Sequence, residues 1–245
     1  MLGLNMFALI VFTALNGVAA YISRCTEDKR NQILRLVCVA LLVFNTARYA
    51  LSPLLGRGFR VPVEFSTFAY FAVPIIVLFN MKRIRSWAAF SGFTAGFFYY
   101  AAMIAAGGIL YGHSRPYDVY LSMACHGVLY LYGMADMKTH LYAPADRYQF
   151  FAGIAYVALR AHLLRPWAGA QNRFLIYGLL DGTYVKAVLP ATMWGSVAPL
   201  YYMLMTVLLF IWISIFFKLN RTKYQRYLQN RGVYSAALSS LPKPV

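Results

Sequence analysis

The sequence predicts an all-α fold: a polytopic transmembrane helical bundle with about seven spans. Of the 245 residues, 61% are hydrophobic and 12% are charged, and the mean hydropathy is +0.56. A soluble domain of this length carries roughly twice that share of charged residues. Several apolar runs reach the ~20 residues that a helix needs to cross a ~30 Å hydrocarbon layer.

Seven apolar segments are the expected spans, and polar or proline-containing stretches separate them. The predicted spans are 2–22, 32–53, 61–81, 87–111, 117–136, 148–165 and 197–218. We therefore expect one transmembrane bundle at residues 1–218, followed by a basic cytoplasmic tail at 219–245.

The distribution of basic residues predicts an N-out/C-in orientation. With the N-terminus outside, fourteen Lys and Arg residues lie in cytoplasmic segments and six lie on the opposite side. Excess Lys and Arg mark cytoplasmic segments, and the cluster at Lys82–Arg85 is the strongest single anchor. The net charge of +16 is thus interpreted as topology and lipid contact rather than nucleic-acid binding.

The connection at 166–196 is too long for a tight turn and carries Arg173, Asp181 and Lys186 among apolar residues. We expect an external loop with an interfacial or re-entrant helix near Arg173–Leu180. The alternative is an additional short span, which would place the tail outside.

The tail is expected to continue the last span as a helix on the inner leaflet. Basic residues there attract an anionic surface by ~1 kcal/mol each, so anionic phospholipid is the expected partner. A solvated cationic flank is the alternative. The three cysteines have no paired spacing, which argues against a disulfide framework and a metal site, and no cofactor is expected.

Polar side chains gather toward the outer half of the predicted bundle. An ionisable residue inside a span costs at least ~2.5–3.5 kcal/mol, so it usually faces the bundle interior and has a partner. The candidates are Asn45 and Arg48 in the second span, Glu64, Ser66 and Thr67 in the third, Ser122, His126 and Tyr130 in the fifth, Arg160 and His162 in the sixth, and Tyr201 in the seventh. This asymmetry predicts a polar pocket in the outer leaflet.

Glu64 is expected to have Arg48 and His126 as partners. His126 shares a helix face with Ser122 and Tyr130, which gives the imidazole polar neighbours. Structural interpretations stay open for each group. Arg48 and Glu64 form only an ion pair in one of them, and Ser66 and Thr67 bond a carbonyl one turn back in another. Arg160 and His162 contact lipid in a third.

Four short motifs are distributed along most of the chain. They are VPVEFS at 61–66, His126-Gly127, GTYV at 182–185 followed by Pro190, and PLYY at 199–202. Their order resembles the YwaF-like family of bacterial integral membrane proteins, which are similar to a eukaryotic transmembrane acyltransferase. The resemblance implies a bacterial cytoplasmic (inner) membrane protein.

Two positions depart from the family pattern. The family tends to have histidine and cysteine where this chain has Glu64 and Ser66. The acyltransferase relative implies a nucleophile paired with a histidine, so the catalytic candidates are Ser66 as nucleophile, His126 as base and Glu64 beside them. Loss of acyl chemistry in this member is the alternative.

Three functions follow from these observations. The first is a lipid acyl hydrolase or acyltransferase, in which Arg48 holds a phosphate or stabilises an oxyanion. The second is a non-catalytic subunit or scaffold that binds lipid, partner proteins or a second copy of itself. The third, a small-solute or proton-coupled transporter, is disfavoured because the polar residues do not continue through the inner half.

Overall fold

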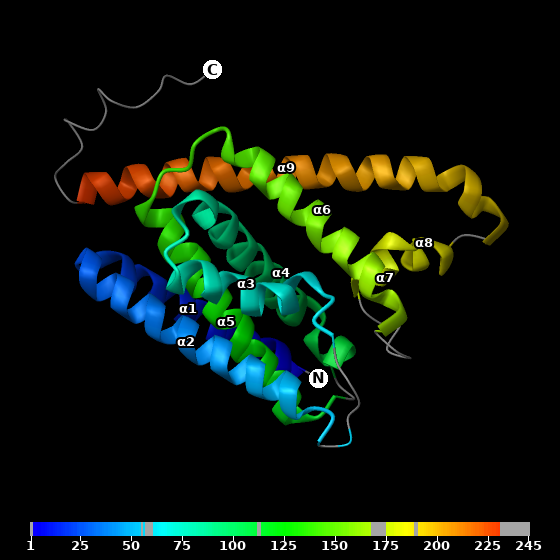
Figure 1. Ribbon diagram of the computed structural model, residues 1–245, viewed down its shortest axis with the longest axis horizontal. Helices are drawn as coiled ribbons and strands as arrows, with labels where there is room; N and C mark the ends of the chain where they lie inside the picture. The colour runs from blue at the N-terminus through cyan, green and yellow to red at the C-terminus, as the bar shows by residue number, and fades with distance from the viewer. Residues whose placement is uncertain are drawn as a thin grey trace.

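The computed structural model describes residues 2–54, 56, 61–111, 114–167, 175–188 and 191–230, and the regular elements in these ranges are all helices (Figure 1). The all-α prediction is therefore confirmed. The long helices are α1 (Leu2–Arg24), α2 (Glu27–Leu51), α3 (Phe65–Leu78), α4 (Arg85–Tyr111), α5 (Pro116–Thr139), α6 (Asp146–Leu164) and α9 (Trp194–Asn230). The short ones are η1 (Lys82–Ile84), η2 (Arg165–Trp167), α7 (Leu175–Leu180), α8 (Thr183–Lys186) and η3 (Ala191–Met193). Arg173, Pro190 and 231–245, to which predictions above refer, lie outside the described residues.

Four helices in the described ranges are long and apolar enough to cross a membrane, which indicates a membrane protein. They are α1, α2, the helix through η1 and α4, and α9. The predicted span at 61–81 is wrong in its length, because α3 has 14 residues and Glu64 is its N-cap. At 1.5 Å per residue α3 rises ~21 Å, less than the ~30 Å hydrocarbon thickness.

α4 and α5 pack against each other at backbone contact in the centre of the bundle. A Cβ atom at Gly96 of α4 would lie 2.5 Å from the Cβ of Tyr130. A Cβ atom at Gly133 of α5 would lie 2.4 Å from the backbone nitrogen of Phe93. Glycine therefore lets the two helices approach closely, as small residues do at membrane helix interfaces.

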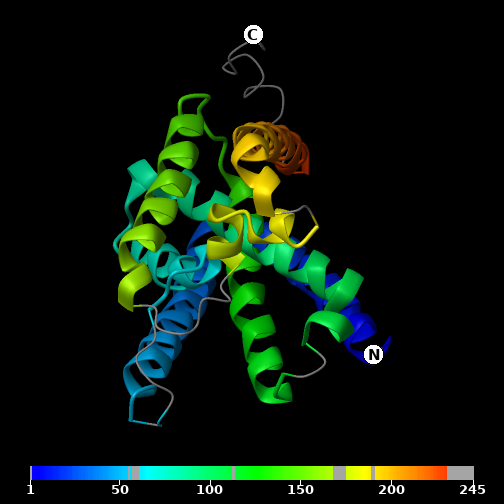
Figure 2. The same cartoon turned by 90° about the vertical axis from the view of Figure 1, so that its right-hand side faces the viewer.

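α9 runs along one side of the bundle, and Figure 2 looks nearly along its axis. Its 37 residues rise ~55 Å, more than a bilayer core requires. The predicted boundary at 218 falls inside α9, and the basic segment that follows is helical to Asn230, as expected. Asn220 is buried and its Nδ2 donates to the Met137 carbonyl at 2.8 Å, which joins α9 to the end of α5.

Candidate functional site

His126 lies at the centre of the predicted outer polar group, and its side chain is enclosed. It is 6% exposed, and its Nδ1 lies 2.8 Å from the carbonyl oxygen of Ser122 one turn earlier. The hydroxyl of Tyr70, on α3, lies 2.8 Å from Nδ1 and 3.3 Å from Nε2. The ring of Tyr99, on α4, stacks on the imidazole with the centroids 3.8 Å apart.

Two groups compete for Nδ1 of His126, since the Ser122 carbonyl and the Tyr70 hydroxyl both lie 2.8 Å from it. If Nδ1 carries the hydrogen, it donates to the Ser122 carbonyl, and the Tyr70 hydroxyl is left with the longer 3.3 Å contact to Nε2. Both nitrogens then have protein partners, and Tyr99 covers one ring face. The shared helix face predicted for Ser122 and His126 is confirmed, since the Ser122 hydroxyl lies 3.3 Å from Nδ1.

Ser66 is half-buried in the first turn of α3, and the hydrogen bonds of His126 do not include it. The α3 residue that reaches the imidazole is Tyr70, one turn further along the helix. The structure therefore does not bring the predicted nucleophile and base into a hydrogen bond. The position of α3 along the axis of α5 decides which turn of α3 contacts His126. The spacing of apolar residues in the sequence does not determine this axial position.

Glu64 binds a different part of the chain from the one expected. Its Oε1 accepts a hydrogen bond of 2.9 Å from the backbone nitrogen of Ile176, in the first turn of α7. Carboxylates favour helix N-termini, where backbone N–H groups lack partners. Among the described residues, Glu64 forms no ion pair with Arg48 or His126, so the expected partners were wrong. Arg48 is half-buried on α2.

Three further candidates donate hydrogen bonds within the protein. Asn45 is buried, and its Nδ2 donates to the Leu41 carbonyl at 2.9 Å. The Thr67 hydroxyl donates to the Glu64 carbonyl at 3.0 Å, which agrees with the structural interpretation of that residue. The Tyr130 hydroxyl donates to Oδ1 of Asn16 on α1 at 2.8 Å. Each contact joins turns or helices of the bundle.

The remaining candidates lie where α6, α7 and α9 meet. Arg160 donates to the carbonyl of Pro62, and its guanidinium lies 4.7 Å from the ring centroid of Phe68. The Tyr201 hydroxyl donates to the Leu179 carbonyl at 2.9 Å, whereas His162 is exposed on α6. Of the predicted residues, Glu64 and Tyr201 thus bind the backbone of α7, whereas Ser122 lies against His126.

Sequence reasoning missed a second buried polar network, around Asp136. Its carboxylate is fully buried and accepts from Nε of Arg85 at 2.6 Å and from the Tyr142 hydroxyl at 2.8 Å. His140 Nδ1 lies 3.2 Å from the same carboxylate. The available signal was an acid in the last turn of a span, close to the same membrane side as the Lys82–Arg85 cluster.

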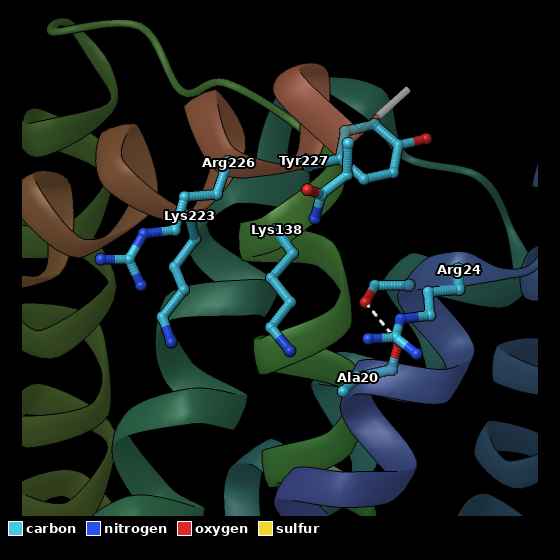
Figure 3. A pocket seen from close by; sticks show the side chains of 8 residues that line it. Ala20, Arg24, Lys138, Lys223, Arg226 and Tyr227 are labelled. Carbon is cyan, nitrogen blue, oxygen red and sulfur yellow. Dashed lines mark hydrogen bonds between the residues drawn. The ribbon is translucent and has the colours of Figure 1, made fainter. Parts of the chain in front are cut away.

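A cavity of about 630 Å³ lies where the ends of α1, α5 and α9 meet, and we call it the basic cavity (Figure 3). This volume is within the usual ~300–1,000 Å³ of ligand pockets. The residues that line it are Ala20, Ser23, Arg24, Lys138, Lys223, Arg226, Tyr227 and Asn230. The four α9 positions follow the i, i+3, i+4, i+7 spacing that places side chains on one helix face.

No model of a known protein family matches this chain, and no curated protein or solved structure matches it.

The basic cavity concentrates positive charge. Lys138 lies two residues beyond the predicted span at 117–136. Partial burial, together with the positive charges of Lys223 and Arg24, lowers the pKa of the Lys138 ammonium to about 8. An anion in the cavity would relieve that repulsion. Among the described residues, no group of three or more His, Cys, Asp or Glu side chains is placed to hold a metal ion.

Proposed function

We propose that this chain is a non-catalytic, multi-pass protein of the bacterial cytoplasmic membrane that binds anionic phospholipid on the inner side. The observation that carries the proposal is the enclosure of His126 by Ser122, Tyr70 and Tyr99. A general base must lie within ~2.6–3.2 Å, measured between heavy atoms, of the group from which it removes the proton. The imidazole already uses both nitrogens within the protein, which favours a structural role.

The basic residues support lipid binding on one side. α1 ends with Arg24, η1 carries Lys82 and Arg83, and α9 continues into a basic segment. In the proposed N-out/C-in orientation these segments all meet the inner leaflet, where anionic lipids attract Lys and Arg.

Helix lengths support seven spans. The predicted span 117–136 within α5 has 20 residues and α6 has 19, which rise ~30 Å and ~28 Å. Both lengths are close to the ~30 Å hydrocarbon layer. We expect the shorter α3 to reach the outer surface through the residues before Glu64, of which Val63 is buried and Val61 and Pro62 are half-buried. Membership of the YwaF-like family remains a prediction.

Incubation with mixed phospholipids tests this function against the acyl-transfer alternative. The purified parent, Ser66→Ala, His126→Ala and the control Thr67→Ala are compared, and lipid products are measured by mass spectrometry. We expect no hydrolysed or transferred acyl chain from any protein, and anionic phospholipid that co-purifies with all of them. Product from the parent and Thr67→Ala, but from neither Ser66→Ala nor His126→Ala, would establish acyl chemistry instead.

A further inference from the structure

We propose that the basic cavity is a specific site for a phosphomonoester group, carried by a lipid headgroup or by a small soluble ester. Only the lipid source rests on the function proposed above. The cavity joins three elements that are distant in the sequence, and each of them contributes at least one basic side chain.

The basic side chains of the cavity have no acidic partner in the described part of the chain. None of the eight lining residues is acidic, and none of their basic groups lies within 4.0 Å of an Asp or Glu carboxylate there. Two basic residues outside the cavity do have acidic partners, since Arg85 binds Asp136 and Arg165 binds Asp181. Unpaired cations gathered around a partly buried space favour an anionic ligand.

A second polar cavity shows the contrast. It has a volume of about 250 Å³. Its lining comes from α2, from the end of α3 and the turn after it, from η1, from the first residue of α4 and from Tyr132 on α5, and it includes Arg35, Lys82 and Arg85. Its lining also includes the acidic Glu27, and Arg85 already holds Asp136. Positive charge in that cavity is therefore partly balanced by the protein itself, whereas the basic cavity has no such balance.

The chemistry of the lining residues favours a phosphomonoester over a phosphodiester. A phosphomonoester carries a charge of about −1.5 to −2 at pH 7 and three acceptor oxygens, whereas a phosphodiester carries one negative charge. Arg24 and Arg226 offer planar guanidinium groups that suit paired contacts to phosphate oxygens, and Lys138 and Lys223 add compact charges.

Figure 3 shows how these side chains lie. The guanidinium of Arg24 points from α1 toward the ammonium of Lys138, and Lys223 extends to the same side from α9. Tyr227 also lines the cavity from α9, and its hydroxyl points away from Lys138 in this view. The lining residues come from three helices, and the guanidinium of Arg226 points away from Arg24.

The test measures ligand affinity by thermal stabilisation of the full-length protein in a neutral detergent. The probes are phosphatidic acid, which is a phosphomonoester, phosphatidylglycerol, which is a phosphodiester, and soluble glycerol phosphate. The cavity variant is Lys223→Gln/Arg226→Gln. Its matched control, Lys218→Gln/Arg221→Gln, removes two charges from the same helix at positions that do not line the cavity.

We expect the parent to bind phosphatidic acid more tightly than phosphatidylglycerol. The cavity variant should lose about 30-fold in affinity, as two basic contacts near an anionic group would give, and the control variant less than about 3-fold. If glycerol phosphate stabilises the parent and the control variant more than the cavity variant, the ligand can be a soluble ester. If phosphatidic acid stabilises the protein and glycerol phosphate does not, the ligand is the lipid.

Three results would overturn the site. They are an equal loss in the two variants, equal affinity for the two lipids, or no stabilisation by any probe. The melting temperatures of the variants without ligand show whether each is folded, and Lys138→Gln serves as a third variant on a different helix. If both variants bind anionic lipid equally, the specific site is wrong but the proposed function stands. If the incubation with mixed phospholipids yields an acyl product, the proposed function alone is wrong.

Discussion

The group around His126 and the basic cavity lie on the same helix, α5, and differ in how their polar atoms are satisfied. His126 has hydrogen bonds from its own helix and from α3, and a ring of α4 covers it. Lys138, twelve residues later and ~18 Å along the axis, has only other cations as charged neighbours. Buried polar groups that have hydrogen-bond partners, like His126, stabilise the fold. Partly buried cations that face only other cations, like Lys138, can instead be stabilised by an anionic ligand.

The largest expected effect comes from breaking a satisfied network. Asp136→Ala removes the carboxylate that Arg85 and Tyr142 bind, and leaves a partly buried cation unpaired. Removal of one partner of a buried pair costs about 3–5 kcal/mol. We expect the free energy of unfolding in detergent to fall by that amount. Asp118→Ala, on the first turn of the same helix, is the control and should change stability by less than about 1 kcal/mol. Similar small changes in both would mean that Asp136 is not structural.

The next largest effect tests whether the His126 group is only structural. Tyr70→Phe removes the hydroxyl that donates to the imidazole, and an unmet buried acceptor costs about 1–3 kcal/mol. Stability should fall accordingly, while the affinity for phosphatidic acid stays unchanged. The control is Tyr117→Phe, since Tyr117 is 66% exposed on α5. Weaker lipid binding in Tyr70→Phe without loss of stability would contradict the contrast between the two regions.

The sequence predicted the positions of the helices better than the contacts between side chains of different helices. Apolar runs located all seven long helices, and the i, i+4 relation of Ser122 and His126 was found because it is local to one helix. The α3 partner of His126 was missed by one turn. Tyr70 and Ser66 lie on neighbouring turns of an apolar helix, and only its packing against α5 selects between them.

Glu64 shows the same limit at longer range. Its partner, the backbone nitrogen of Ile176, is 112 residues away, and a backbone group carries no signal in the sequence. The basic tail was predicted to meet anionic lipid, but a cavity was not. It needs Arg24 and Lys138 from two other helices, whose positions beside α9 depend on tertiary packing.

A smaller effect is expected in the pH dependence of the basic cavity. The pKa of Lys138 is lowered to about 8, because the side chain is partly buried and faces Lys223 and Arg24. Lys138 is therefore charged below pH 8 and loses its charge as the pH rises through that value. Affinity for phosphatidic acid should fall by about 5-fold between pH 7 and pH 9, as the loss of one basic contact would give.

Lys138→Arg is the matched variant, since a guanidinium stays charged throughout this range. The fall in affinity should therefore disappear in Lys138→Arg, while the affinity of this variant at pH 7 stays close to that of the parent. Tyr227→Phe is a second control, because it removes the phenolic hydroxyl group from the lining. An unchanged fall in Lys138→Arg would assign the pH dependence to another group.

The smallest effect concerns charges that are exposed and paired, a third case beside the two regions above. Arg165 binds Asp181 with contacts of 2.9 and 2.6 Å, and this pair joins the end of α6 to the turn after α7.

The Arg165 guanidinium lowers the pKa of the Asp181 carboxyl. The pair therefore contributes stability above the ordinary Asp pKa of about 3.9 and loses it as the pH falls through the lowered value. Asp181→Asn should lower the free energy of unfolding only slightly at pH 7, by less at high salt, and not at all in acid. Asp28→Asn, at an exposed position on α2 without an ion pair among the described residues, is the control in the same unfolding measurement. A loss as large as that of Asp136→Ala would mean that this pair behaves like the buried Asp136 network, because water and salt screen exposed pairs far more than buried ones.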